Sequence, residues 1–324
     1  MHRNVAPPNR LAGSQGVSMR LYALSGLIVL LGLVALRGSH SICTSGAQPI
    51  GHLSRQTLDQ CFAATRLMAL PDRVKFWSRR FLGTPYHSDP LGEGRGDHDP
   101  DPVWDLGRVD CLTFVEEVMA LSYSNCWEEF VPNLVRLRYR GGKPRFSKRY
   151  YTMAKGWIAA QVAAGRLQDI TRAVGGRHVK KVSLNLDRRS FWRPSYRARF
   201  ALLGKFAPRG KVRIVYIPLR WAIRLADRFP DAAVMHIVRA PTRTSPYLVS
   251  HTGLVVHRGG HVYFRHASRT PGRRKVEDRP LDEYLQSLSR FLEDKGWRPV
   301  LGVNLDRIRV PRHNQVVSSQ KAGK

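Results

Sequence analysis

Cysteine is scarce in this chain of 324 residues, and its spacing excludes two classes of small domain. The four cysteines are Cys43, Cys61, Cys111 and Cys126. No two of them form a Cys-x-x-Cys pair, which argues against a zinc ribbon. Four are also too few to build a disulfide framework in a chain of this length. A disulfide between Cys61 and Cys126 would leave Cys111 as a single thiol, and the sequence leaves that pairing open.

Acidic residues are few as well. Asp and Glu total 24 against 54 Lys and Arg, so the formal net charge is +30. A protein of this charge attracts polyanions such as nucleic acid, anionic lipid or an acidic wall polymer. The net charge alone does not identify which of these polyanions is the partner. A basic amino-acid composition shared by all proteins of the host organism would give the same net charge. Apolar residues make up 43% of the chain, which excludes disorder over its full length.

The first 47 residues are typical of an export signal rather than of a folded domain. An apolar run over residues 21–36 follows three arginines; it is short for a membrane-spanning helix but suits the core of a signal peptide. Small residues permit cleavage after Ala47. An uncleaved anchor is the main alternative, and lipidation at Cys43 is a weaker one because the residues before it form a poor lipobox. Each predicts an exported protein, either periplasmic or anchored to the outer face of the inner membrane.

Hydrophobic periodicity predicts helices first and strands afterwards. We expect helices over residues 53–70, 72–82, from 111 onward and over 153–164, and strands over 212–217, 233–238, 251–257 and 261–266. This order favours an α+β fold with helices on one side of an antiparallel sheet. The catalytic domain would span residues 48–310, with the basic, aromatic-rich stretch 174–211 as an insertion or poorly packed excursion. Residues 311–324 would form a frayed basic tail.

Cys111 is a candidate nucleophile because it follows a turn and opens a predicted helix. Asp110 is a good N-cap for that helix. The positive end of a helix favours a thiolate over a thiol, and a cysteine nucleophile reacts as the thiolate. A cysteine at the start of an apolar helix is, however, more often a small core residue. The nucleophilic interpretation therefore requires a base nearby.

Two histidines on a predicted hairpin could supply that base. If Gly259 and Gly260 form a two-residue turn, His251 and His266 point to the same face of the ribbon, in diagonal positions. Gly253 would pair with His266 and leave space between the two rings. A histidine oriented by a second polar side chain is what a Cys-His-X triad requires. Two solvated histidines are the plain alternative, and a β-bulge would shift the register.

Metal binding is a weaker interpretation of the same residues. Cys111, His251 and His266 are all residue types that bind zinc. Asp97, Asp99 and Asp101 alternate as calcium ligands do, but the glycine and glutamate of an EF-hand loop are missing, so an ordinary acidic loop is favoured.

Several short motifs occur in one order that is familiar from a known family. They are FLGTPY at 81–86, LGEG at 91–94, VDCLTFVE at 109–116, SHTG at 250–253, HAS at 266–268 and PLDEYL at 280–285. Together they resemble the N-acetylmuramoyl-L-alanine-amidase-like family, a branch of the NlpC-type, papain-like cell-wall hydrolases. The resemblance covers roughly residues 76–308, apart from the basic stretch. The block around Cys111 is the most specific of the motifs.

The resemblance implies a papain-like NlpC-type core and a role for five residues. Cys111 would be the nucleophile, His251 the base and His266 the residue that orients the base. Tyr86 and Asp110 would lie at the substrate and oxyanion side of the site, with the backbone N–H of Cys111 as a further oxyanion donor. No cofactor is implied.

The implied activity is hydrolysis of peptidoglycan or muropeptides, at the bond between N-acetylmuramic acid and L-Ala. Cleavage of the γ-D-glutamyl bond to the diamino acid is the close alternative. A polyanion-binding protein with a vestigial Cys-His site is a second, based on the basic segment 188–209, although export makes nucleic acid an unlikely partner. Acyl transfer on the same scaffold is a third, and the oligomeric state stays open. Arg149-Tyr150-Tyr151 and Gly156-Trp157 depart from the family's His-Tyr-Phe and Asp-Trp pattern, which leaves the specificity open.

Overall fold

A computed structural model describes residues 48–94, 98–187, 194–242, 245, 247–293 and 299–310. The predicted signal segment, residues 1–47, and the predicted tail, residues 311–324, lie outside these ranges. Within the ranges, no helix has the length and apolar character needed to cross a membrane.

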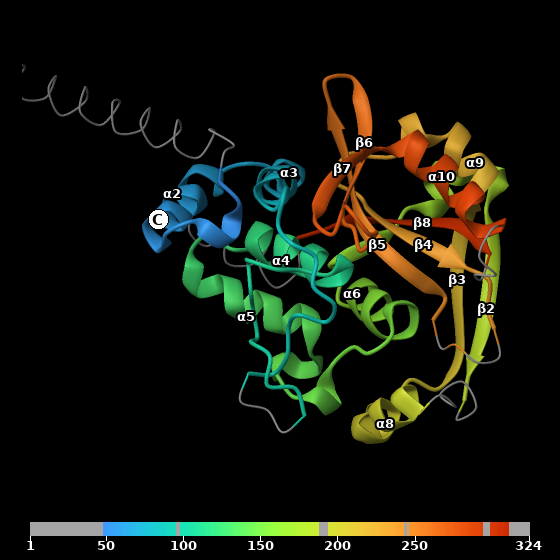
Figure 1. The fold of residues 1–324 in the computed structure, drawn as a ribbon, viewed down its shortest axis with the longest axis horizontal. Helices are drawn as coiled ribbons and strands as arrows, with labels where there is room; N and C mark the ends of the chain where they lie inside the picture. Colours follow the sequence, from blue (N-terminus) through green and yellow to red (C-terminus); the bar gives the residue numbers. More distant parts are fainter. Residues whose placement is uncertain are drawn as a thin grey trace, which may run out of the picture. The chain divides into compact units, whose positions relative to one another are not determined.

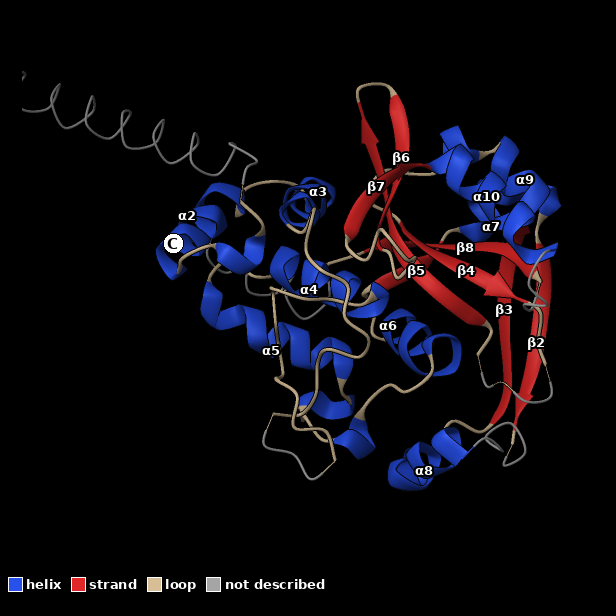
Figure 2. Cartoon of the chain, viewed as in Figure 1, coloured by secondary structure: helices blue, strands red, loops and turns tan. Residues whose placement is uncertain are grey.

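An eight-stranded antiparallel sheet forms the centre of the fold (Figure 2). Seven strands run in the order β2-β3-β8-β4-β5-β6-β7, and β1 pairs with β8. The strands are β1 (Leu167–Asp169), β2 (Lys180–Leu186), β3 (Gly210–Pro218), β4 (Val234–Arg239), β5 (Val249–Arg258), β6 (His261–Ala267), β7 (Val276–Pro280) and β8 (Val300–Ile308). The predicted α+β class with an antiparallel sheet is confirmed, and all four predicted strands are present.

Helices precede the sheet and also follow or interrupt it (Figure 1). They are α2 (Arg55–Thr65), α3 (Leu70–Arg80), α4 (Cys111–Tyr123), α5 (Trp127–Arg138), α6 (Ala159–Ala163), α7 (Thr171–Gly175), α8 (Pro194–Leu203), α9 (Leu219–Arg224) and α10 (Leu281–Glu293). The helix expected over 153–164 is a π-helical segment, Met153–Ile158, that continues into α6. Pro71, which lies between the two helices expected over 53–70 and 72–82, belongs to the first turn of α3, where its missing N–H costs nothing.

The helices cover both faces of the sheet, so the predicted one-sided arrangement is wrong. Met235 and Ile237 of β4 belong to a core that includes Leu281 and Leu285 of α10. His236, between them in sequence, faces the other way and lies beside Trp157 of the π-helical segment. Successive side chains of a strand point to opposite faces, and β4 is buried at five consecutive positions. A strand buried on both sides needs cover on both sides.

The basic stretch 174–211 is largely built into the sheet, so the prediction of a poorly packed excursion is wrong for its described residues. Strand β2 pairs with β3 along its whole length, from Lys180 opposite Tyr216 to Leu186 opposite Gly210. Helix α8 follows, and its Leu203 is buried in a small cluster with Phe146. Alternating Val, Leu and Ile residues on β2 and β3 give this ribbon one apolar face. The many Lys and Arg residues of the segment make this alternation hard to recognise from the sequence.

Candidate active site

Cys111 is the first residue of α4 and is held there by a capping box. The Asp110 carboxylate accepts hydrogen bonds from the backbone N–H groups of Leu112 (2.8 Å) and Thr113 (2.7 Å). The Thr113 hydroxyl accepts the backbone N–H of Asp110 at 2.8 Å. This reciprocal cap fixes where the helix begins. Asp110 therefore has a structural role in placing Cys111. Its carboxylate accepts hydrogen bonds here, so it does not donate one to an oxyanion.

The β5–β6 hairpin has the predicted register. Arg258 pairs with His261 across the two glycines, and Leu254 pairs with Arg265. His251 and His266 consequently share one face, and His251 Nε2 lies 2.8 Å from His266 Nδ1. The geometric part of the histidine prediction is thus confirmed.

Gly253 makes this close approach of the two strands feasible. A Cβ at this position would lie 2.6 Å from the carbonyl oxygen of Arg265 and 2.8 Å from Cβ of His266. Real Cβ atoms essentially never come so close to other atoms. The glycine is therefore required by packing between the histidine-bearing strands.

Strand β5 also brings the histidine pair to the cysteine. The backbone of Thr252, the neighbour of His251, is among the groups that favour the ionised form of the Cys111 thiol, and α4 packs against β5. Nε2 of His251 is engaged with His266, so Nδ1 is the ring nitrogen that His266 leaves unoccupied. The three predicted catalytic residues come from α4, β5 and β6, and α4 packs against both strands.

Burial favours the neutral forms of both the Cys111 thiol and the His251 imidazole. Burial, followed by the charge of Asp110, raises the pKa of Cys111 from 9.0 to about 12. Burial, together with the charges of Arg269 and Arg239, lowers the pKa of His251 from 6.5 to about 3. Burial also lowers the pKa of His266. The direction at Cys111 is opposite to the one expected from the helix N-terminus, because desolvation of the thiolate outweighs the favourable helix end.

Tyr86 lies in an extended segment fixed between two parts of the chain. Its backbone N–H donates to the carbonyl of Arg274 at 2.9 Å, and it forms a parallel bridge with Val109, two residues before Cys111. The guanidinium of Arg274 lies 5.8 Å from the centre of the ring. Burial raises the pKa of the Tyr86 hydroxyl, which is a hydrogen-bond donor at neutral pH in any case.

Two residues beside His266 were not predicted. The ring of Tyr284 lies 5.1 Å from that of His266, and Oε1 of Glu277 lies 3.8 Å from Nε2 of His266. Tyr284 belongs to the PLDEYL motif, to which the family resemblance assigns no role for the tyrosine. Glu277 is paired with His266 in the register of β6 and β7, so only a prediction of β7 could have found it.

The residues considered as metal ligands do not gather around one point in the described ranges. His251 and His266 bond directly to each other, so these two nitrogens cannot both face one metal ion. In the described ranges, no group of three or more His, Cys, Asp or Glu residues could hold a metal. Asp99 forms an ion pair with Arg149 at 2.8 Å, and Asp97 lies outside the described residues. Cys61 and Cys126 are not joined by a disulfide.

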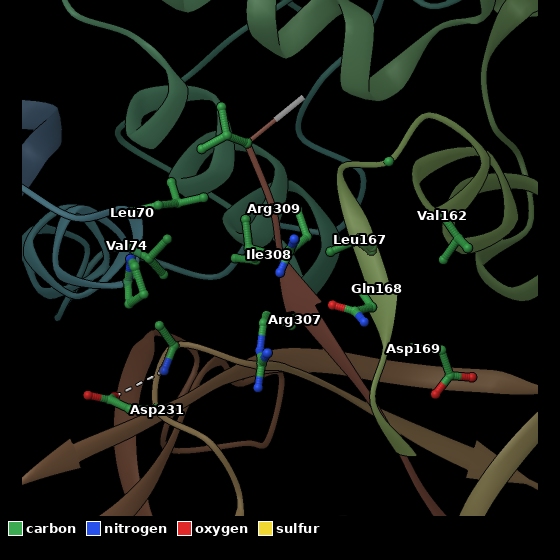
Figure 3. A pocket seen from close by; sticks show the side chains of 14 residues that line it. Leu70, Val74, Val162, Leu167, Gln168, Asp169, Asp231, Arg307, Ile308 and Arg309 are labelled. Atoms are coloured by element: carbon green, nitrogen blue, oxygen red, sulfur yellow. Dashed lines mark hydrogen bonds between the residues drawn. The ribbon is translucent and has the colours of Figure 1, made fainter. Parts of the chain in front are cut away.

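A pocket of about 770 Å³ lies elsewhere on the fold (Figure 3). Its walls come from α3, α6, β1 and the end of β8, with Leu70, Val162, Leu167 and Ile308 among the lining residues. None of the predicted catalytic residues lines it. This pocket therefore gives no support to the predicted site at Cys111.

Comparisons with known proteins agree with this architecture. A family model described as AmiA-like, N-acetylmuramoyl-L-alanine amidase-like, matches residues 76–291. A crystal structure of a Legionella pneumophila protein matches with a TM-score of 0.67 and 21% identity, covering 78% of this chain and 94% of that one. A crystal structure of an N-acetylmuramoyl-L-alanine amidase from Bacteroides uniformis matches with a TM-score of 0.54 and 22% identity, covering 74% and 99%. No curated protein matches the chain.

Proposed function

The chain belongs to the N-acetylmuramoyl-L-alanine amidase-like family, and from that premise we propose that it is a cysteine amidase acting on peptidoglycan fragments. Cys111 is the nucleophile, His251 the base and His266 the residue that orients the base. The observation that carries the proposal is the 2.8 Å hydrogen bond between the two histidines, on strands against which the helix of Cys111 packs. This arrangement is the one that a Cys-His-X triad of the papain-like, NlpC type would have.

The reaction begins from the neutral pair. The Cys111 thiol gives its proton to Nδ1 of His251 while the sulfur attacks the amide carbonyl carbon, and the carbonyl electron pair moves to oxygen. When the tetrahedral intermediate collapses, the C–N bond breaks and His251 returns the proton to the leaving amine. Water then gives a proton to His251 and attacks the thioester carbon. The C–S bond breaks, and the Cys111 sulfur regains a proton.

Two donors can stabilise the oxyanion in this scheme. The backbone N–H of Cys111 lies in the first turn of α4, where N–H groups have no partner within the helix. The Tyr86 hydroxyl is protonated at neutral pH, as a phenol ordinarily is, and burial raises its pKa further. Donors aimed at the developing charge, in a site with little water, contribute more than they would in solution.

The scissile bond is the finer part of the proposal. The name of the family supports the bond between N-acetylmuramic acid and L-Ala. The γ-D-glutamyl bond to the diamino acid requires the same catalytic groups, so the triad does not separate the two. Purified protein incubated with defined muropeptides, with products identified by mass, decides between them. Free muramic-acid sugar with an intact stem peptide supports the amidase, and cleavage within the stem peptide supports the alternative.

Export is a separate proposal that rests on the sequence. The apolar run at 21–36, after three arginines, supports a signal peptide or anchor that delivers the enzyme to the periplasm or to the outer face of the inner membrane. Fractionation of cells expressing the full chain, together with the mass of the mature N-terminus, tests it. Uncleaved protein in the cytoplasmic fraction would contradict it.

A polyanion-binding role has one observation in its favour. Lys181, Lys211 and Arg213 are exposed, and the pairing of β2 with β3 places them on one face of the ribbon. Replacing all three by Glu should abolish salt-dependent binding to single-stranded DNA or to anionic vesicles if this role is the real one. Muropeptide hydrolysis that survives the replacement would leave the amidase as the function.

A further inference from the structure

The orienting histidine has one ring nitrogen that the proposed triad does not use. Nδ1 of His266 lies 2.8 Å from Nε2 of His251, whereas Nε2 of His266 is buried and has no hydrogen-bond partner among the described residues. The His266 ring is packed in place, since it stacks on Phe264 with centroids 4.8 Å apart and lies 5.1 Å from the ring of Tyr284. With the ring held in this way, the remaining freedom is which of its two nitrogens carries the proton.

The reaction as proposed works with only one of these two tautomers. His251 can accept the thiol proton at Nδ1 only if its own proton is on Nε2, and that N–H must then donate to Nδ1 of His266. In this arrangement His266 carries its proton on Nε2. The other tautomer reverses the hydrogen bond: His266 donates from Nδ1, and His251 carries its proton on Nδ1, where it cannot act as the base.

Glu277 is placed to select between the two tautomers. It lies opposite His266 in the pairing of β6 with β7, and its Oε1 is 3.8 Å from the unpartnered Nε2. An ionised carboxylate only accepts hydrogen bonds, so it favours the tautomer that presents an N–H to it. An N–H···O hydrogen bond spans about 2.7–3.2 Å, and the terminal torsion of a glutamate is soft enough to close the difference.

The ion pair that Glu277 forms with Arg273 does not compete strongly with this contact. Nη1 of Arg273 lies 3.3 Å and 3.2 Å from the two carboxylate oxygens, and the arginine side chain is half exposed. Exposed ion pairs of this kind contribute little free energy. The Glu277 side chain itself is only 14% exposed, so solvent screens its charge little on the side of His266. Arg273 therefore keeps the carboxylate beside the histidine and leaves it able to turn toward Nε2.

We propose that Glu277 is a positioning residue of the catalytic group, which accepts a hydrogen bond from Nε2–H of His266 and thereby sets the tautomers of both histidines. The inference rests on the proposed function, because it concerns how the base of that reaction is prepared. A carboxylate fixes the tautomer of the histidine in a Ser-His-Asp triad, and Glu277 acts in the same way one histidine further out. When His251 becomes an imidazolium, the same hydrogen bonds persist and the nearby negative charge favours that form.

Muropeptide hydrolysis by the wild type, Glu277→Leu, Glu277→Gln and the control Glu283→Gln gives kcat and KM for this test. Glu277→Leu removes the acceptor and should lower kcat roughly 10- to 100-fold with KM changed less than about threefold, as expected when a residue that orients a site histidine is lost. Glu277→Gln should recover part of this loss, because an amide oxygen can still accept from Nε2–H. Glu283 is exposed in the first turn of α10, so Glu283→Gln should match the wild type.

Nitrogen NMR of the full chain, with isotope-labelled histidine rings, reports the tautomers without any substrate. The signals of the two rings are assigned by their loss in His251→Asn and His266→Asn. The wild type should carry the proton on Nε2 of both histidines, with Nδ1 of His251 unprotonated. Glu277→Leu should shift both rings toward the Nδ1–H form, and Glu277→Gln should lie between it and the wild type. A residue that only packs against its neighbours would not move these signals.

The two readouts separate this inference from the proposed function. A wild type with the His266 proton on Nδ1 overturns the role of Glu277, whether or not the protein is active. A loss of kcat in Glu277→Leu with unchanged tautomers shows a packing role and also overturns it, as do unchanged kcat and tautomers. The expected tautomers in a wild type that hydrolyses no muropeptide support the hydrogen-bond arrangement and overturn the proposed function. If urea denaturation shows Glu277→Leu to be unfolded, Glu277→Gln decides, because wild-type kcat and tautomers in that variant would overturn the role.

Discussion

Gly253→Ala should destabilise the protein and inactivate it, although a single methyl group is added. In an ordinary strand, replacing glycine with alanine stabilises a protein by roughly 0.5–1 kcal/mol. Here the new Cβ would lie 2.6 Å from a backbone oxygen, 2.8 Å from His266 Cβ and 2.8 Å from a ring carbon of Phe264. Overpacking of this kind costs about 1–3 kcal/mol, and the backbone contact places the expected loss near the upper end. The strands must separate, which lengthens the 2.8 Å hydrogen bond between the histidines.

Urea denaturation measures the free energy of unfolding of the variant, and muropeptide hydrolysis measures kcat. Gly107→Ala is a matched control, because the nearest atom to its new Cβ would be a side-chain oxygen of Asp105 at 3.2 Å. That control should stay within about 1 kcal/mol of the wild type. An increase in stability of Gly253→Ala, or unchanged kcat, would refute the argument that this glycine sets the spacing of the histidine pair.

Three further predictions concern the triad and the oxyanion. His266→Ala should lower kcat on the order of 10²- to 10⁴-fold. His266→Asn should recover part of this loss, because an amide can still hydrogen-bond to His251. Equal kcat of the wild type and the two variants would remove His266 from the mechanism. Because the pKa of Cys111 is raised to about 12, alkylation of Cys111 by iodoacetamide, followed by mass, should be slow at pH 7 and rise about tenfold per pH unit up to pH 10. A plateau between pH 5 and 8 would instead indicate a resting thiolate-imidazolium pair. Tyr86→Phe should lower kcat on the order of 10- to 10³-fold with little change in KM if the hydroxyl stabilises the oxyanion; a change in KM alone would make Tyr86 a substrate-binding residue.

Local sequence signals predicted the parts of the site that depend on local structure. Asp110 before an apolar helix indicated the N-cap of α4, and the structure contains that cap. Two glycines between alternating segments fixed the hairpin register, and the register placed His251 and His266 on one face. Both inferences depend on residues close together in the chain, where backbone geometry leaves few choices.

Long-range features escaped prediction for a physical reason. Helices on both faces of the sheet follow from the burial of β4 on its two sides, which depends on which strands flank it. Glu277 reaches His266 only through the pairing of β6 with β7. The raised pKa of Cys111 follows from tertiary burial, which a helix-end argument does not include. The pairing of β2 with β3 was hidden because charged residues on one face of the ribbon dominate the composition.

Muropeptide hydrolysis by the purified wild type beside Cys111→Ala tests the central claim most directly. The account predicts release of stem peptide by the wild type and none by Cys111→Ala, with both proteins unfolding at the same urea concentration. Equal hydrolysis by both proteins would show that the chemistry does not run through Cys111, and it would contradict the Cys111, His251 and His266 assignment.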